Sequence, residues 1–225
     1  ALGLLAGCVL VACGTSDPAE TVSPTAYHMY DHMARTAAVQ HAILAGNINA
    51  ARAPASWLDL HLSPSGMGGQ ADAYVAQMRT AAGQISSART LDEAAVHLGE
   101  MGTACGACHQ AARVQVDFRW LPVPPTNGEI DSHMERHQWA LDRLWEGLAG
   151  PSEKAWDAGS EVLADPTLPI SRIGAEAGRR HRAEAGDLAV HERGAQATRE
   201  TYPNRRAELF SELIVTCRDC HVLMV

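Results

Sequence analysis

The segment TACGACHQA, residues 103–111, contains the motif Cys-x-x-Cys-His, and TCRDCHVLM, residues 216–224, contains it again. The offset between the first cysteines of the two motifs is 217 − 105 = 112. Two similar segments precede them, HMYDH at residues 28–32 and HMERH at residues 133–137, and their offset is 133 − 28 = 105. The two offsets differ by 112 − 105 = 7, which corresponds to about two helical turns. The chain therefore contains an internal duplication, in which each half starts with His-Met-x-x-His and ends with Cys-x-x-Cys-His.

The composition favours helices over sheets. Aromatic residues make up only 5% of the 225 residues, and the long uninterrupted stretches are rich in Ala, Leu, Glu and Arg, which favour helices. Hydrophobic and histidine side chains recur at spacings of three and four, which predicts one core-facing helix at the start of each half. The two stripes are Met29, His32, Thr36, Val39 and Ile43, and Met134, His137, Leu141, Leu144 and Leu148.

Helix-starting residues divide each half further. A polar N-cap residue or a proline in the first turn is typical of a helix start, and such residues occur at Ser23, Asn47, Thr90, Ser152 and Pro203. Third helices are expected over roughly 69–87 and 171–196. We therefore predict an all-α chain made of two tandem four-helix bundles, each with one covalently bound cofactor on its last helix.

The proline-rich string Pro122-Val123-Pro124-Pro125 cannot continue a helix, so it predicts a linker between the halves. The predicted organisation is a signal peptide and tether over 1–23, a first bundle over 24–116, a linker over 117–126 and a second bundle over 127–225.

The beginning of the sequence predicts export. Residues 1–12, ALGLLAGCVLVA, are apolar, but this run is too short to span a bilayer and is typical of a signal peptide. Leu10-Val11-Ala12-Cys13 resembles a bacterial lipobox, which makes Cys13 the candidate lipidation site. Cys8 is a second possibility. We expect a bacterial lipoprotein, periplasmic or associated with the outer membrane, and an ordinary cleaved signal is the alternative.

The Cys-x-x-Cys-His motif indicates haem. Two thiols three residues apart on a helix can form thioether bonds to the two vinyl groups of a haem, and the adjacent histidine can ligate the iron. A Cys₄ zinc site and a redox-active Cys-x-x-Cys pair are the alternatives. The histidine that follows each pair, and the equivalent positions of the two pairs, favour two haem c groups. The predicted attachment residues are Cys105, Cys108, Cys217 and Cys220, with His109 and His221 as proximal iron ligands.

The segment GEMGTACGACHQAAR, residues 99–113, resembles the cytochrome c-prime superfamily, the four-helix-bundle class II cytochromes c. These are antiparallel four-helix bundles with Cys-x-x-Cys-His near the end of the last helix, and the resemblance covers both halves. The second copy departs from the pattern because only Val-Leu-Met-Val follows His221, so its last helix is expected to be truncated or short. The resemblance implies covalent haem in each half.

The distal iron ligand is open to several residues. Some members of the superfamily have an open sixth position and bind small gases, whereas others resemble low-spin carriers with a methionine ligand early in the first helix. Met29 and Met134 match such a ligand, and His32 and His137 on the same stripes are the alternatives. We interpret the histidines without a partner in the other half as surface or hydrogen-bonded side chains, namely His41, His61, His97, His181 and His191.

These features predict an electron-transfer protein and not an enzyme. The expected partners are redox proteins of the cell envelope, or the subunits of a larger electron-transfer complex, with membrane contact only through the lipid anchor. The formal net charge of −8 argues against nucleic acid as a partner. The alternative is a cytochrome that binds or senses NO or CO at an open sixth haem position.

Overall fold

The structure is a computed structural model that describes residues 23–61, 69–126, 129–166 and 177–224. This part of the chain forms eight helices and no strand, which confirms the all-α prediction. None of its helices combines the length and the apolar character needed to cross a membrane. The predicted signal segment and the candidate lipidation residue Cys13 lie outside the described residues.

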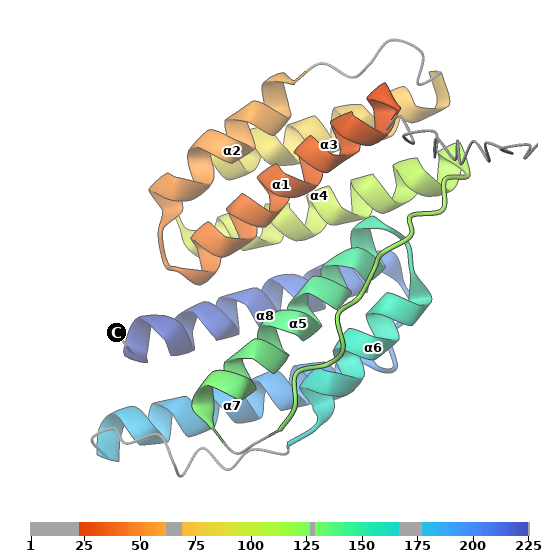
Figure 1. The fold of residues 1–225 in the computed structure, drawn as a ribbon. Helices are drawn as coiled ribbons and strands as arrows, with labels where there is room; N and C mark the ends of the chain where they lie inside the picture. The colour runs from red at the N-terminus through yellow and green to blue at the C-terminus, as the bar shows by residue number, and fades with distance from the viewer. Residues whose placement is uncertain (1–22, 62–68, 127–128, 167–176, 225) are drawn as a thin grey trace, which may run out of the picture.

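The helices form two groups that follow the order of the chain. The first group contains α1 (Pro24–Leu44), α2 (Ile48–Leu60), α3 (Gly69–Ser87) and α4 (Leu91–Ala112). The second contains α5 (Ile130–Ala149), α6 (Glu153–Ala164), α7 (Ala177–Ala197) and α8 (Pro203–Met224). Figure 1 shows the two groups packed against each other, with α4 of the first group beside α5 and α8 of the second.

The helix starts agree with the sequence. The side chains of Ser23, Asn47 and Ser152 each accept a hydrogen bond from a backbone N–H in the first turn of α1, α2 and α6. Thr90 and Glu93 form a complete capping box at the start of α4. These contacts satisfy backbone donors that a helix start leaves without partners, so local chemistry explains why the helices begin there.

The last helix departs from expectation. The prediction of a truncated or short final helix was wrong, because α8 has 22 residues, the same number as α4. Residues on both sides of the second Cys-x-x-Cys-His motif are helical, so the motif lies within a full-length helix in each group.

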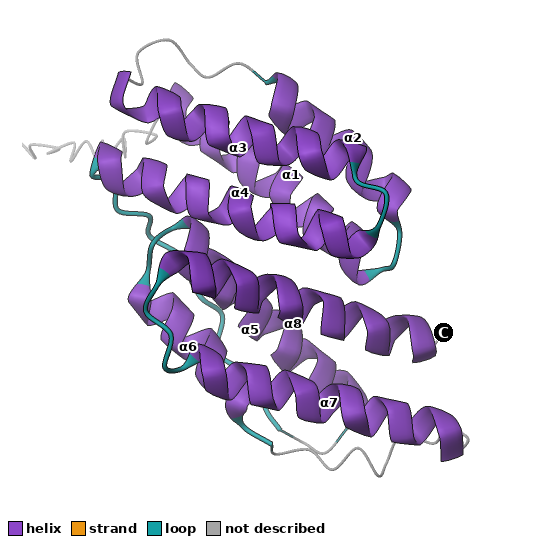
Figure 2. Ribbon diagram, turned by 180° about the vertical axis from the view of Figure 1, so that it is seen from behind, coloured by secondary structure: helices purple, strands orange, loops and turns teal. Residues whose placement is uncertain are grey.

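A single core runs through both groups. The largest cluster of buried apolar residues includes side chains from all eight helices. At its centre α4 and α8 lie side by side and antiparallel (Figure 2), and the Ser211 hydroxyl donates a 2.8 Å hydrogen bond to the Ala95 carbonyl. A Cβ added to Gly99 would lie 2.6 Å from the carbonyl oxygen of Ala207. The backbones of the two groups therefore meet directly, and Gly99 permits this approach.

The segment that connects the two groups is held to α5 by two hydrogen bonds. The indole N–H of Trp120 donates to the carboxylate of Glu146 at 2.8 Å, and that of Trp139 donates to the carbonyl of Leu121 at 2.9 Å. Figure 1 shows this segment crossing over α5 in an extended path. We call this segment, which includes Trp120 and Leu121, the connecting strap.

Candidate functional sites

The two Cys-x-x-Cys-His motifs lie at opposite ends of the α4–α8 pair. An ion pair between Arg218 and Asp92 places the second motif opposite the start of α4. The offset from Asp92 to Cys105 is 105 − 92 = 13, which corresponds to about 20 Å along an α-helix. The four cysteines therefore cannot share one tetrahedral zinc site, which removes the Cys₄ alternative.

The thiols are held in their neutral form. Burial raises the pKa of Cys105 and of Cys217 to about 12, and burial also raises the pKa of Cys108 and of Cys220. Redox-active cysteines need a lowered pKa, because the thiolate is the nucleophile. This environment does not supply one, so the arrangement does not favour thiol redox chemistry.

In the second group the predicted residues surround one cavity of about 190 Å³ between α5, α7 and α8. Apolar side chains such as Leu141 and Val190 form part of its wall. The predicted site residues that line it are Met134, His137, Cys217, Cys220 and His221. The fold thus brings both thiols, the proximal histidine and both candidate distal ligands of the second half to one space.

This set of donors fits a covalently attached haem. It combines two thiols and an imidazole from α8 with a thioether and an imidazole from α5. The cavity is smaller than the roughly 300–1000 Å³ typical of ligand pockets. A haem held there would therefore need the cavity walls to lie further apart.

In the first group His109 is oriented as a metal ligand would be. Its Nδ1 atom lies 2.8 Å from the carbonyl oxygen of Ala149 at the end of α5. Because a carbonyl oxygen only accepts hydrogen bonds, Nδ1 carries the proton and Nε2 keeps its lone pair. Burial lowers the pKa of His109, so the ring is neutral at pH 7. Metal-binding histidines commonly make this contact through their second nitrogen.

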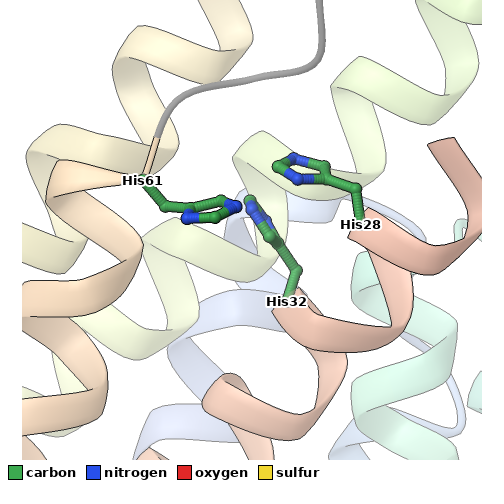
Figure 3. A group of neighbouring side chains, drawn as sticks. All are labelled: His28, His32 and His61. Atoms are coloured by element: carbon green, nitrogen blue, oxygen red, sulfur yellow. The ribbon is translucent and has the colours of Figure 1, made fainter. Parts of the chain in front are cut away.

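The histidines of α1 form a cluster with a third histidine from α2. The ring centroid of His28 lies 4.2 Å from that of His32 and 5.0 Å from that of His61. Trp57 of α2 stacks on His61 with centroids 3.8 Å apart. Figure 3 shows the three imidazoles converging from α1 and from the end of α2. The sequence interpretation treated His61 as a surface or hydrogen-bonded side chain, and the structure places its half-buried ring in this cluster.

Two ring nitrogens of the first cluster have no hydrogen-bond partner among the described residues. The Nε2 atoms of His28 and His32 are buried and accept or donate no hydrogen bond. Burial lowers the pKa of His32 to about 4, and the neighbouring rings of His28 and His61 contribute to this lowering. Burial likewise lowers the pKa of His28. Both rings are therefore neutral at pH 7, and the Nε2 atom of each has no hydrogen-bond partner within the described part of the chain.

The equivalent cluster in α5 has an acidic partner. The rings of His133 and His137 lie 4.1 Å apart, almost the same distance as in α1. Asp187 of α7 accepts a 2.9 Å hydrogen bond from Nε2 of His133 and lies 3.2 Å from Nε2 of His191. Burial lowers the pKa of His137 to about 3. His191 is buried and donates to the Leu163 carbonyl, as the sequence interpretation allowed, but it is also part of this second cluster.

The third members of the clusters could not be found from the duplication. His61 follows the last residue of α2, whereas Asp187 and His191 lie in α7, the third helix of its group. Because the two halves recruit different helices, these residues have no counterpart at an equivalent position.

A second hollow on the described surface is larger than the cavity of about 190 Å³ and lies elsewhere. It has a volume of about 1060 Å³ and opens between α3, α4, α7 and α8. None of the residues predicted for the haem sites lines it. The chemistry predicted from the sequence therefore belongs to the smaller cavity and to the histidine clusters.

Comparisons of the chain with protein-family models, curated proteins and solved structures find no match.

Proposed function

We propose that this chain is a dihaem c-type cytochrome that transfers electrons in the bacterial cell envelope. The observation that carries the proposal is the second-group cavity, where Cys217, Cys220 and His221 meet Met134 and His137. These residues belong to two motifs that are far apart in the sequence, at an offset of 217 − 134 = 83. Their convergence supports a common ligand, and the motif chemistry makes that ligand haem c.

Equivalent residues would hold one haem in each half. Cys105 and Cys108 would carry the first haem, with His109 as proximal ligand; Cys217 and Cys220 would carry the second, with His221. Haem c supplies a one-electron couple between ferric and ferrous iron. The chain would orient the proximal ring of His109 through the Ala149 carbonyl and shield the buried thiol of Cys217 from water.

Met29 and Met134 are the proposed distal ligands. Met134 lines the second cavity, and Met29 occupies the equivalent position of α1. A thioether ligand stabilises ferrous iron and raises the reduction potential, which suits a carrier. His137 lines the same cavity and is the alternative there, with His32 in the first half.

The proposed architecture is two tandem four-helix bundles like those of the cytochrome c-prime superfamily. Four consecutive helices in each group, with the haem motif in the fourth, support it. Redox proteins of the cell envelope would be the partners, and Cys13 would anchor the chain to a membrane.

The test is to produce the chain in a bacterial periplasm with a haem-attachment system. We expect two haems per chain in a pyridine haemochrome assay, and one after Cys105→Ala with Cys108→Ala. Ferric and ferrous absorption spectra should be low-spin and unchanged by carbon monoxide. No covalent haem would contradict the proposal, and a high-spin haem that binds carbon monoxide would support gas binding at that site.

A further inference from the structure

Two buried nitrogens in the first histidine cluster have no explanation in the fold. His28 is only 6% exposed, and its Nε2, like that of His32, has no hydrogen-bond partner. Leaving a buried polar group unpaired destabilises a fold. Two such atoms on adjacent turns of one helix, close to a third imidazole, indicate a ligand that accepts all three lone pairs.

The spacing of the ring nitrogens suits a metal ion. One nitrogen from each of His28, His32 and His61 lies within 4.8 Å of the other two. Two nitrogens bound to one tetrahedral Zn²⁺ at about 2.05 Å would be about 3.4 Å apart. Small rotations of the side chains therefore bring the three rings to binding distance.

The second cluster shows what the first lacks. His133 donates a hydrogen bond to the carboxylate of Asp187, and Nε2 of His191 lies 3.2 Å from the same carboxylate. In the first group the nearby acidic residue is Asp31, which has only a minor influence on the pKa of His28. Among the described residues, no ring of the cluster forms a hydrogen bond with Asp31. The duplicated histidine pair thus meets an anion in one half and no partner in the other.

The surroundings hold the third ring in place. Trp57 stacks on His61 at an interplanar angle of 18°, and the guanidinium of Arg35 lies 5.0 Å from the Trp57 ring. A fixed ring loses less freedom when it binds a metal.

We propose that His28, His32 and His61 form a binding site for one divalent transition-metal ion of the Zn²⁺ or Cu²⁺ class, separate from haem. Imidazole suits both ions, and three histidines leave a fourth position for water. The ion would join the start of α1 to the end of α2. Met29 lies about 100° around α1 from His28, so it remains available to the first haem.

The test uses the full haem-loaded chain, in which the cysteines are alkylated by haem and cannot bind the added metal. After dialysis against a chelator, the chain is titrated with Zn²⁺ by calorimetry and with Co²⁺ by visible absorption. We expect one ion per chain at this site. His61→Ala should weaken Zn²⁺ binding at least about tenfold. Loss of a residue that only hydrogen-bonds to a metal ligand already costs about tenfold or more, so loss of a ligand should cost no less. The matched control is His97→Ala. His97 pairs with Glu100 on α4, so its loss should leave Zn²⁺ binding unchanged.

Two results would overturn the site. Zinc affinity that is unaffected by His61→Ala would exclude this cluster. Loss of the low-spin haem spectrum in His32→Ala, with no change in zinc affinity, would assign His32 to the haem. The haem content is measured separately by the haemochrome assay, so failure of the metal site and failure of haem attachment are distinguishable.

Discussion

The carbonyl oxygen of Ala149, at the end of α5, accepts a 2.8 Å hydrogen bond from Nδ1 of His109 on α4. The predicted proximal ligand of the first half is therefore oriented by the second half. This contact depends on Gly106, because a Cβ there would lie 2.4 Å from the carbonyl oxygen of Leu148. This contact joins the predicted haem ligand of the first group to the second group.

Gly106→Ala should separate α4 from the end of α5 and weaken the hydrogen bond to His109. We expect a loss of about 1–3 kcal/mol in the free energy of unfolding, as for other overpacked sites. We also expect a changed midpoint potential for one haem only, measured by spectroelectrochemical titration. Gly83→Ala on α3 is the control, because its Cβ would meet only the flexible Asp59 carboxylate, at 3.3 Å. Equal shifts in both potentials would contradict the assignment.

Glu146→Ala should destabilise the chain strongly. Glu146 and Arg143 are both 8% exposed, and the same carboxylate accepts the Trp120 N–H of the connecting strap. Removing one partner of a buried ion pair costs about 3–5 kcal/mol, since the other charge stays buried and unpaired. Urea unfolding followed by circular dichroism measures the change.

The matched control for that variant is Glu208→Ala. Arg205 and Glu208 have the same three-residue spacing, but the Glu208 side chain is 62% exposed. Its loss should change the free energy of unfolding by less than about 1 kcal/mol. Similar effects of the two substitutions would show that burial of the first pair does not matter.

Asp187→Asn should give a pH-dependent loss of stability. Burial alone would raise the pKa of Asp187, but hydrogen bonds from His133 and His191 outweigh it and hold the pKa below its ordinary value. A lowered folded-state pKa stabilises the fold above about pH 4, and this contribution is lost as the pH falls further. We expect a deficit of about 2–3 kcal/mol at pH 7 that shrinks towards pH 3.

The measurement is urea unfolding across that pH range. Asp157→Asn, at an exposed position of α6, is the control and should show no such pH dependence. A deficit for Asp187→Asn that stays constant down to pH 3 would exclude an ionised Asp187 as its cause.

In the haem-free chain the first cysteine of each motif should be the slower to react. Burial raises the pKa of Cys105 and Cys217 to about 12, so the thiolate is scarce at pH 8. We expect iodoacetamide to modify Cys108 and Cys220 first, as followed by peptide mass spectrometry. Faster labelling of Cys105 than of Cys108 would show that the first motif is open.

The sequence predicted the helices better than their contacts. Side chains such as Ser23 and Thr90 act on the first turn that follows them, so a single sequence reveals their role. The histidine pairs were found because both halves repeat them. The role of His61 was missed because the ring comes from the end of a different helix, and only tertiary packing brings it to α1.

The interface between the two groups of helices could not be predicted from the sequence either. Nothing in the local pattern distinguishes Gly99, whose missing side chain admits Ala207, from a glycine that merely weakens a helix. The predicted length of the last helix, α8, was also wrong. Few residues follow His221, but α8 continues for three residues beyond it, just as α4 continues for three residues beyond His109.

The hydrogen bond between Ser211 and Ala95 spans 116 residues of chain. Contacts of such long sequence separation form late in folding, because closing a long loop costs more entropy than pairing neighbouring helices. We therefore expect α4 to pair with α3 before α8 arrives. The first Cys-x-x-Cys-His motif would then remain accessible to a haem-attaching enzyme during this interval, and closure of the α4–α8 pair would end it.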